Sequence, residues 1–471
     1  MLRKIFILIV SLSAAPGRGQ LADLLFPRAA DSVREMTDSL TRNPFANQPI
    51  HFSGDLLGNT LNLLSVLPIA IARTLGGGNG IPSLINNNNL ASLGDNFISD
   101  YNLGLGNEDC QLRCDQLIAK YGYLVERHDI VTEDGYVLTM FRIPSDGPVV
   151  FLQHGLLGSS DDYVIAGPDT GIAYLLAKDG YDVWLGNSRG NKHSRRHVEM
   201  DPSQGDYWDF SWHEVGYYDL PAMIDYALNA TGQEKLKYIG HSQGTTSFWV
   251  MGSERPEYND KISLMVALSP VAFMSNLKSP IIRLLAPTGG FIHAFVKTIG
   301  LHELLPDNNA MKLYRRLLCG AGPPAEILCA NLLFLVAGFN VEQLNVTNLP
   351  VIYSHVPSGA SAKQAAHYGQ GVISAKFRQF DYGTAGNLER YGSEQPPDYA
   401  LENVRAPVSM VYSDADWLAD PRDVDELYNK LPNVVDIHKV PHKNFNHLDY
   451  VFAKDVKYLI YKRLRKLLSN F

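Results

Sequence analysis

The segment GHSQG at 240–244 constrains the fold of this chain more than any other, because an alternating apolar run precedes it and a helical pattern follows it. The pattern G-x-S-x-G between a strand and a helix is typical of a nucleophile elbow, a sharp turn that exposes one serine side chain. A Cβ at Gly240 or Gly244 would clash with the neighbouring turn, which explains the two glycines. The helix N-terminus behind Ser242 would offer N–H groups and a favourable dipole to a developing oxyanion. We therefore predict that Ser242 is a nucleophile.

Short apolar runs alternate with helical patterns along much of the chain. Alternation around the turn signal Glu133-Asp134-Gly135 predicts two paired strands within 126–143. The other predicted strands lie at 148–153, 181–185, 236–240, 262–268, 407–412 and 434–440, and the clearest predicted helices at 222–228, 421–431 and 450–468. Strands that alternate with helices indicate a mostly parallel central sheet flanked by helices, so we expect an α/β fold.

The chain also divides by composition. Residues 1–19 combine a basic start, a short apolar run and small residues, which predicts a secretory signal peptide. That run is shorter than the ~20 residues of a membrane span, and we expect no transmembrane segment elsewhere. Residues 20–106 are rich in Asn and Gly with little periodicity, which predicts a low-complexity extension, either flexible or a pro-segment. Residues 273–398 are apolar and mainly of helical period, which predicts a cap inserted into one domain at 107–471.

Charge and motif content exclude several classes of partner. The net charge of −8 over 471 residues is mild, and no long basic block precedes the C-terminus, so we expect no nucleic-acid partner. The histidines are dispersed and neither H-E-x-x-H nor a paired C-x-x-C occurs, so no metal site is predicted. The sequence also contains neither G-x-G-x-x-G nor a Walker motif, so it implies no cofactor.

The four cysteines fit an oxidising compartment. Cys319 and Cys329 enclose a short loop and are candidates for a disulfide. Cys110 and Cys114 are close enough in sequence to pair, although a local helix would equally keep both free.

Two N-x-S/T sequons occur, at Asn229 and Asn345. In a protein with a signal peptide, such sequons are candidate glycan sites on the surface. Together with the cysteines, they indicate a secreted or lysosomal protein.

The acid that would support a nucleophilic serine is expected between that serine and the base, because this fold type uses the chain order Ser, Asp or Glu, His. Asp416 lies just beyond the predicted strand that ends at 412, and therefore at the same sheet edge as Ser242. Asp414 and Asp420 compete with it. Asp420 has a sufficient role as the N-cap of a helix that starts at Pro421, and Asp414 fits the turn after the strand.

The base is expected beyond the last strand. His447 lies between that strand and the last predicted helix, in the segment NFNHLD at 444–449. His438 falls inside the strand and would have to point out of a packed face, and His442 comes early in the loop. We therefore predict that Ser242, Asp416 and His447 form a catalytic triad.

An oxyanion hole needs two backbone N–H donors. One is expected from Gln243, the residue after the nucleophile, and the other from the loop after an early strand. That loop reads QHGLLG at 153–158, and its glycines would let the backbone approach a substrate carbonyl. We predict that Leu156 supplies the second N–H group.

Seven motifs resemble those of one family, the acid lipases, which include the lysosomal and gastric lipases of animals and many insect relatives. They are VTEDGY at 131–136, HGLL at 154–157, YDVWLGNSRG at 181–190, DFSW at 209–212, GHSQGTT at 240–246, LADP at 418–421 and NHLD at 446–449. The resemblance covers about residue 109 to the C-terminus. It implies the α/β-hydrolase fold, with an inserted, mainly helical cap or lid.

The same resemblance implies roles for particular residues. Ser242 would be the nucleophile, Asp416 and His447 its partners, and Leu156 and Gln243 the oxyanion hole. Family members also carry a disulfide in the cap, which the pair at 319 and 329 resembles. Two features depart from the family: the long extension at 20–106, and an aspartate at 414 where relatives tend to carry glycine.

These expectations combine into one predicted activity. The chain would be a serine-dependent carboxylic ester hydrolase that acts on neutral lipids, triacylglycerols or steryl esters, at a lipid–water interface. Two alternatives stay open: a short-chain or hormone-type esterase of the same fold, and a non-catalytic lipid-binding protein on a hydrolase scaffold.

Overall fold

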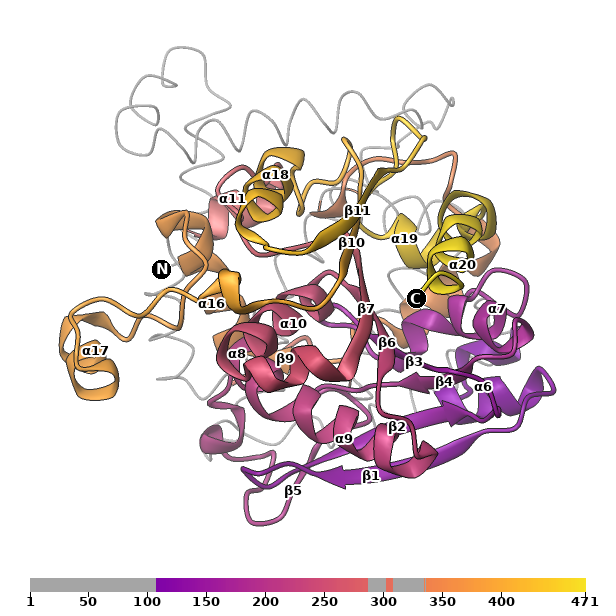
Figure 1. Cartoon of the computed structure of the whole chain (residues 1–471), viewed down its shortest axis with the longest axis horizontal. Helices are drawn as coiled ribbons and strands as arrows, with labels where there is room; N and C mark the ends of the chain where they lie inside the picture. The colour runs from indigo at the N-terminus through magenta and orange to yellow at the C-terminus, as the bar shows by residue number, and fades with distance from the viewer. Residues whose placement is uncertain (1–106, 287–301, 308–333, 335) are drawn as a thin grey trace, which may run out of the picture.

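A computed structural model describes residues 107–286, 302–307, 334 and 336–471 of the chain. A nine-stranded sheet runs through these residues, with helices packed around it (Figure 1). The strand order is β1 (Glu126–Val131), β2 (Tyr136–Ile143), β4 (Asp182–Leu185), β3 (Val149–Gln153), β6 (Leu236–His241), β7 (Ile262–Leu268), β10 (Val408–Tyr412) and β11 (Val434–Lys439). The two-residue strand β5 (Arg196–His197) pairs with β2 outside this order.

The sheet is antiparallel only at one end. β1 and β2 form the predicted hairpin, and β2 also pairs antiparallel with β4. From β4 to β11, every neighbouring pair of strands is parallel. The mostly parallel sheet predicted from the alternation of strands and helices is therefore confirmed, and the parallel strands bring their carboxyl ends to one edge.

Strand β3 shows why the central strands are mostly apolar. Val149 and Phe151 belong to one layer of the core, whereas Val150 and Leu152 belong to the layer on the opposite face of the sheet. All five residues of β3 are buried. Because both faces of a parallel sheet are covered, both sides of this strand are apolar up to its last residue, Gln153. The loops that leave these strands thus start from a rigid base.

Helices connect the parallel strands: α7 (Ile172–Lys178), α8 (Trp212–Glu214), α9 (Leu220–Thr231), α10 (Gln243–Glu254) and α18 (Pro421–Lys430). Helix α6 (Cys114–Lys120) precedes the first strand, and α19 (Asp449–Phe452) and α20 (Lys462–Leu468) follow the last one. Helix α18 begins as predicted, because the Asp420 side chain accepts a hydrogen bond from the Arg422 N–H at 3.0 Å and Pro421 takes the first helical position.

The single last helix predicted at 450–468 is wrong. Helix α19 ends at Phe452, and Ala453 is extended and forms an antiparallel bridge with Leu344. The Lys454 N–H then donates to the Gln343 carbonyl at 2.9 Å, before a π-helical turn leads into α20. Backbone pairing with a segment more than a hundred residues earlier thus interrupts a helical sequence pattern.

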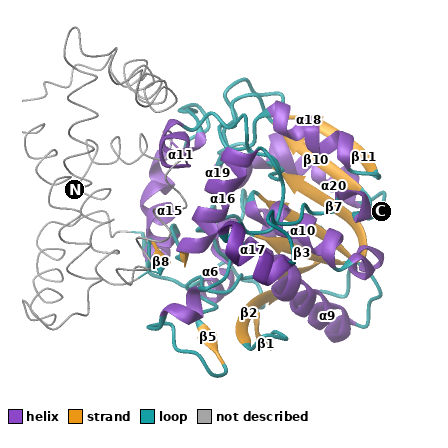
Figure 2. Cartoon of the chain, turned by 90° about the vertical axis from the view of Figure 1, so that its left-hand side faces the viewer, coloured by secondary structure: helices purple, strands orange, loops and turns teal. Residues whose placement is uncertain are grey.

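The described part of the predicted cap is mainly helical. It contains α11 (Pro280–Leu285), α15 (Leu349–His355), α16 (Ala362–Ser374) and α17 (Gly383–Tyr391), with the 3-10 turn η8 (Val346–Asn348) and the short paired strands β8 (Glu303–Leu304) and β9 (Ala360–Ser361). Helices α11, α16 and α17 lie to the left of the sheet in Figure 1, on the side that faces the viewer in Figure 2.

Several predictions fall on residues that the structure does not describe. The signal peptide at 1–19, the extension at 20–106 and the Cys319–Cys329 pair lie outside the described residues. Of the other two cysteines, Cys114 is buried, and no disulfide joins it to Cys110.

The two predicted glycan sites lie on described residues. Asn229 is exposed near the end of α9, and Asn345 is half-buried just before η8. The Thr347 hydroxyl donates to the Asn345 side chain at 2.7 Å. No described helix has both the length and the apolar character needed to cross a membrane.

Candidate active site

Ser242 occupies the sharp turn between β6 and α10. Its backbone has φ 53° and ψ −117°, which is strained for a residue with a side chain. A Cβ on Gly240 would come within 2.8 Å of the Gly244 carbonyl group, and a Cβ on Gly244 would overlap the carbonyl oxygen of Gln153. Only glycine fits at these two positions, so the geometry of the turn explains both glycines of the GHSQG pattern.

The structure brings Ser242 together with the two residues predicted as its partners. The Ser242 Oγ lies 2.7 Å from Nε2 of His447. Nδ1 of the same imidazole lies 3.0 Å and 3.1 Å from the two carboxylate oxygens of Asp416. When Nδ1–H donates to the carboxylate, Nε2 is left free to accept the serine proton.

The Asp416 carboxylate is buried and fully hydrogen-bonded. Its Oδ1 accepts from the N–H groups of Leu418 and Ala419, each at 2.9 Å, and its Oδ2 accepts from the Ser269 hydroxyl at 2.6 Å. Burial on its own raises the pKa of this carboxyl, but the charge of His447 and these hydrogen bonds outweigh burial and lower it below its usual value. Asp416 therefore stays ionised, as the partner of a protonated imidazole must.

The competing residues lie elsewhere. Asp414 is exposed and forms an ion pair with Lys439 at 2.5 Å, so its charge is already paired at the surface. His438 is half-buried within β11, and His442 contacts Glu342 at 3.3 Å. Asp420 caps α18, as described above.

The loop predicted to complete the oxyanion hole runs against Ser242. A Cβ on Gly155 would lie 3.0 Å from the Cβ of the serine. Gly158 N–H donates to the Gly155 carbonyl at 3.1 Å, which closes a tight turn around Leu156. Gln243 is the first residue of α10. Within the described residues, no protein group accepts a hydrogen bond from the backbone N–H of Leu156 or of Gln243, so both donors are available to a bound oxygen.

Comparison with known proteins shows the family of this chain. Residues 148–296 match the model of the alpha/beta hydrolase fold, and residues 114–167 match the model of a partial alpha/beta-hydrolase lipase region. The chain is 44% identical to Lipase 3 of Drosophila melanogaster over 366 residues, which cover 76% of this chain and 93% of that protein. The chain belongs to the acid lipase family of α/β-hydrolases. The resemblance inferred from its motifs is thus confirmed.

Other relatives of this lipase family member are similar over most of their length. Gastric triacylglycerol lipase of Bos taurus is 37% identical over 375 residues, which cover 77% of this chain and 93% of that protein. A putative lipase from Sulfolobus solfataricus shares the fold at 13% identity, with a TM-score of 0.50 over 74% of this chain and 94% of that one. The α/β-hydrolase fold is confirmed by these matches.

The cap of this family member is tied to the oxyanion loop by contacts that the sequence does not reveal. Ser358 donates its N–H to the Leu157 carbonyl at 2.7 Å and accepts from the Lys192 N–H at 2.9 Å. Leu157, the residue after the predicted donor, has φ 63°. A cap residue therefore holds this strained part of the loop.

Asp161 also links the region of the oxyanion loop to the cap. This fully buried carboxylate lies 2.5 Å from Nζ of Lys192, 2.7 Å from Nε2 of His193 and 2.6 Å from Nδ1 of His355, which ends cap helix α15. Burial raises the pKa of Asp161, but the charges of Lys192 and His193 lower it well below its usual value. We call Asp161, Lys192, His193 and His355 the Asp161 cluster.

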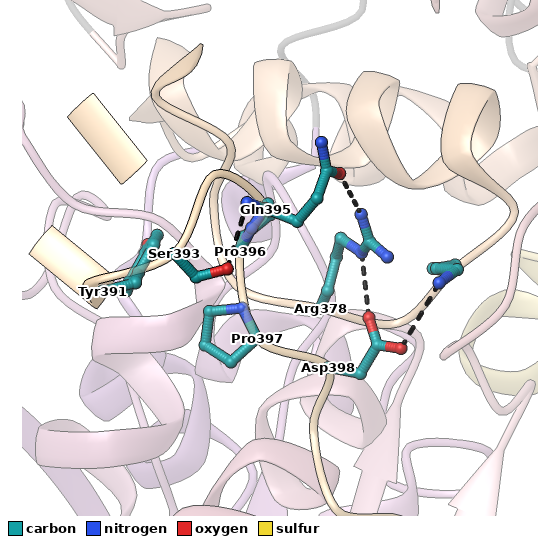
Figure 3. A pocket seen from close by; sticks show the side chains of 8 residues that line it. Arg378, Tyr391, Ser393, Gln395, Pro396, Pro397 and Asp398 are labelled. Carbon is teal, nitrogen blue, oxygen red and sulfur yellow. Dashed lines mark hydrogen bonds and ion pairs between the residues drawn. The ribbon is translucent and has the colours of Figure 1, made fainter. Parts of the chain in front are cut away.

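A surface hollow of about 410 Å³ lies beside α17 and is separate from this site. Figure 3 shows its charged groups paired with one another: Arg378 donates to Asp398 at 2.9 Å and to Gln395 at 3.2 Å. None of its lining residues belongs to the predicted triad or oxyanion loop. Among the described residues, no three His, Cys, Asp or Glu side chains are grouped so that they could hold a metal ion.

Proposed function

We propose that this protein is a lipase that hydrolyses carboxylic esters of neutral lipids through an acyl-enzyme on Ser242. The Ser242 Oγ attacks the ester carbonyl while His447 takes its proton, and Asp416 stabilises the imidazolium that forms. The N–H groups of Leu156 and Gln243 hold the oxyanion of the tetrahedral intermediate. His447 then protonates the leaving alcohol, and the acyl-enzyme is hydrolysed by a water that the same imidazole activates.

One observation carries this proposal. Nε2 of His447 lies 2.7 Å from the Ser242 Oγ, while its Nδ1 lies 3.0 Å from a buried, ionised Asp416. This arrangement activates a serine for attack on an acyl group. A non-catalytic lipid-binding protein would have no need to hold these three side chains at such distances.

The substrate class rests on the relatives and on the cap. Among the relatives, gastric triacylglycerol lipases are named for triacylglycerol. The cap is mainly helical where it is described, and its apolar residues would shield an acyl chain from water at a lipid–water interface. We therefore expect a lipid ester as the substrate, with no cofactor in the reaction.

The proposed location follows from the N-terminus and from the surface. A signal peptide at 1–19 would bring the chain into the secretory pathway, where Asn229 and Asn345 would carry glycans and Cys319 and Cys329 would pair. We propose that the protein is secreted or lysosomal. Digestion of the purified secreted protein with a glycosidase would shift its mass if either asparagine is modified.

Hydrolysis of p-nitrophenyl esters of increasing acyl length, from acid to neutral pH, tests the proposal. The processed protein is expected to prefer long chains, and Ser242→Ala is expected to lose at least about 10³-fold in kcat. Preference for short chains would favour an esterase. Inactivity of folded wild type would refute the proposal in favour of lipid binding.

A further inference from the structure

Ser269 contacts two of the three proposed triad members, although it is not one of them. It is the first residue beyond β7, at the same sheet edge as Ser242. Its N–H donates to the Val411 carbonyl at 2.9 Å, which ties the turn to β10. Its φ of 55° lies in the left-handed region, which few residues other than glycine adopt. The side chain is completely buried.

The Ser269 hydroxyl completes a closed hydrogen-bond network. Its Oγ lies 2.6 Å from the Asp416 Oδ2 and 2.8 Å from Nδ1 of His447. The single hydroxyl proton is donated to the carboxylate, because the imidazole Nδ1 carries its own proton. That Nδ1–H is then shared between the carboxylate and the free lone pairs of the serine oxygen.

The two oxygens of the Asp416 carboxylate differ in their hydrogen-bond donors, and this difference gives the Ser269 hydroxyl a specific role. Oδ1 of Asp416 has two backbone donors, from Leu418 and Ala419. Oδ2 has, among the described residues, the Ser269 hydroxyl and the His447 ring alone. Without the hydroxyl, the imidazole would be the only hydrogen-bond partner of Oδ2 among the described residues, and Nδ1–H would lose its shortest acceptor.

We propose that Ser269 is a positioning residue for ester hydrolysis, which orients the His447 imidazole through a hydrogen bond to Nδ1 and holds the Asp416 carboxylate against it. This inference rests on the proposed function of Ser242, Asp416 and His447. When His447 takes the serine proton, the new positive charge is shared through Nδ1–H with an oxygen that is already in place. Ser269 forms no bond to substrate and keeps its own proton throughout.

The variant Ser269→Ala tests this inference. We expect kcat for a p-nitrophenyl ester to fall about 10- to 100-fold, the value of a hydrogen bond to a charged group, while KM stays within about twofold of wild type. A change in kcat without a change in KM is the expected signature, because the hydroxyl acts on the imidazolium that forms during reaction and not on substrate binding.

Ser409→Ala is a matched control. Ser409 is also fully buried, in the adjacent strand β10, and its hydroxyl donates to the carboxylate of Asp436 at 2.9 Å. Removal of this hydroxyl should lower the unfolding midpoint by an amount similar to that in Ser269→Ala but leave kcat unchanged. A similar loss of kcat in both variants would mean that removal of any buried serine hydroxyl lowers activity, and would overturn the inference.

A second variant separates the hydroxyl from the backbone. Ser269→Gly also lacks the hydroxyl but adopts φ 55° without strain, so it should fold even if Ser269→Ala does not, and it should show the same loss of kcat. Wild-type kcat in either folded variant would overturn the role of Ser269. If wild type itself hydrolyses no ester while folded, the proposed function fails first; if wild type is active and Ser242→Ala is not, only the role of Ser269 is at stake.

Discussion

The two sides of Ser242 are built in different ways. On the acid–base side, Asp416 and His447 leave the carboxyl ends of β10 and β11, and Ser269 leaves the end of β7. These strands are neighbours in the sheet, and their residues contact one another directly. The side chains on this side are therefore held at the edge of the buried sheet, and the cap contacts the backbone next to them, where the His447 N–H donates to the Ala337 carbonyl at 3.2 Å.

On the oxyanion side, the loop at 155–158 depends on residues outside the sheet. Its strained Leu157 is held by Ser358 of the cap, and the Asp161 cluster joins the same region to helix α15 through His355. The cap thus contacts both sides: the Ser358 N–H donates to the Leu157 carbonyl at the oxyanion loop, and the Ala337 carbonyl accepts from the His447 N–H. The difference is that the side chains of the proposed triad are held by one another and by Ser269, whereas the strained backbone of the oxyanion loop is held by a residue of the cap.

The largest expected effect is on the acid–base side. Asp416→Asn keeps the shape of the side chain but removes the charge that stabilises the imidazolium, so kcat for ester hydrolysis should fall about 10⁴-fold. Asp414→Asn is the matched control, because Asp414 is exposed and paired with Lys439, and it should keep wild-type kcat. A large loss of kcat in Asp414→Asn with little loss in Asp416→Asn would show that Asp414, and not Asp416, is the acid.

The next largest effect is on the stability of the oxyanion side. Asp161→Asn leaves Lys192 and His193 without their buried counter-charge, so the free energy of unfolding should fall by about 3–5 kcal/mol. Because the folded-state pKa of Asp161 is lowered, this deficit should be present above about pH 4 and disappear as the pH falls further. Denaturant unfolding at several pH values measures it.

Asp169→Asn serves as the control for this experiment, since Asp169 pairs with Lys178 at the exposed surface at 3.2 Å. Its unfolding midpoint should equal that of wild type. Equal stability of Asp161→Asn and wild type at neutral pH would show that the cluster does not anchor the cap, and would remove the contrast between the two sides.

A smaller effect is the loss of stability at low pH that His154 causes. Nδ1–H of the buried His154 donates to the Gly155 carbonyl at 2.8 Å, and its Nε2 accepts from the Ser188 N–H at 3.1 Å, so the ring must stay neutral. Burial lowers the pKa of His154 to about 4. Its contribution to stability is therefore complete above pH 6.5 and is lost as the pH falls from there toward 4.

His154→Gln should remove this dependence. The stability difference between wild type and the variant should shrink by about 3 kcal/mol between pH 7 and pH 4. His438→Gln, on the edge strand β11, is a control with a smaller expected change, since burial also lowers the pKa of His438 but the side chain is only half-buried. A difference that is constant with pH in His154→Gln would contradict the neutral ring.

The contrast between the two sides also explains what the sequence could predict. The strands are predictable because they are short, apolar and separated by turn signals, and the proposed triad because each member follows a strand end in a fixed chain order. Ser269 also follows a strand end, but a serine before a proline resembles any turn residue, and only the structure shows the direction of its hydroxyl.

The contacts of the cap could not be predicted for a different reason. His355 and Asp161 are 194 positions apart, and nothing in either local pattern indicates a partner at that distance. The same holds for the break at Ala453, where pairing with Leu344 overrides a helical pattern. Local periodicity predicts elements, whereas the packing of an insertion on its domain depends on three-dimensional contacts.

The most direct test of the central claim is covalent labelling with a fluorophosphonate, which reacts with an activated serine, followed by mass spectrometry of the peptides. A single modified residue, Ser242, is predicted, with labelling lost in His447→Ala and unchanged in Asp414→Asn. Labelling of a different serine, or equal labelling of Ser242→Ala, would contradict the assignment of the nucleophile and the mechanism built on it.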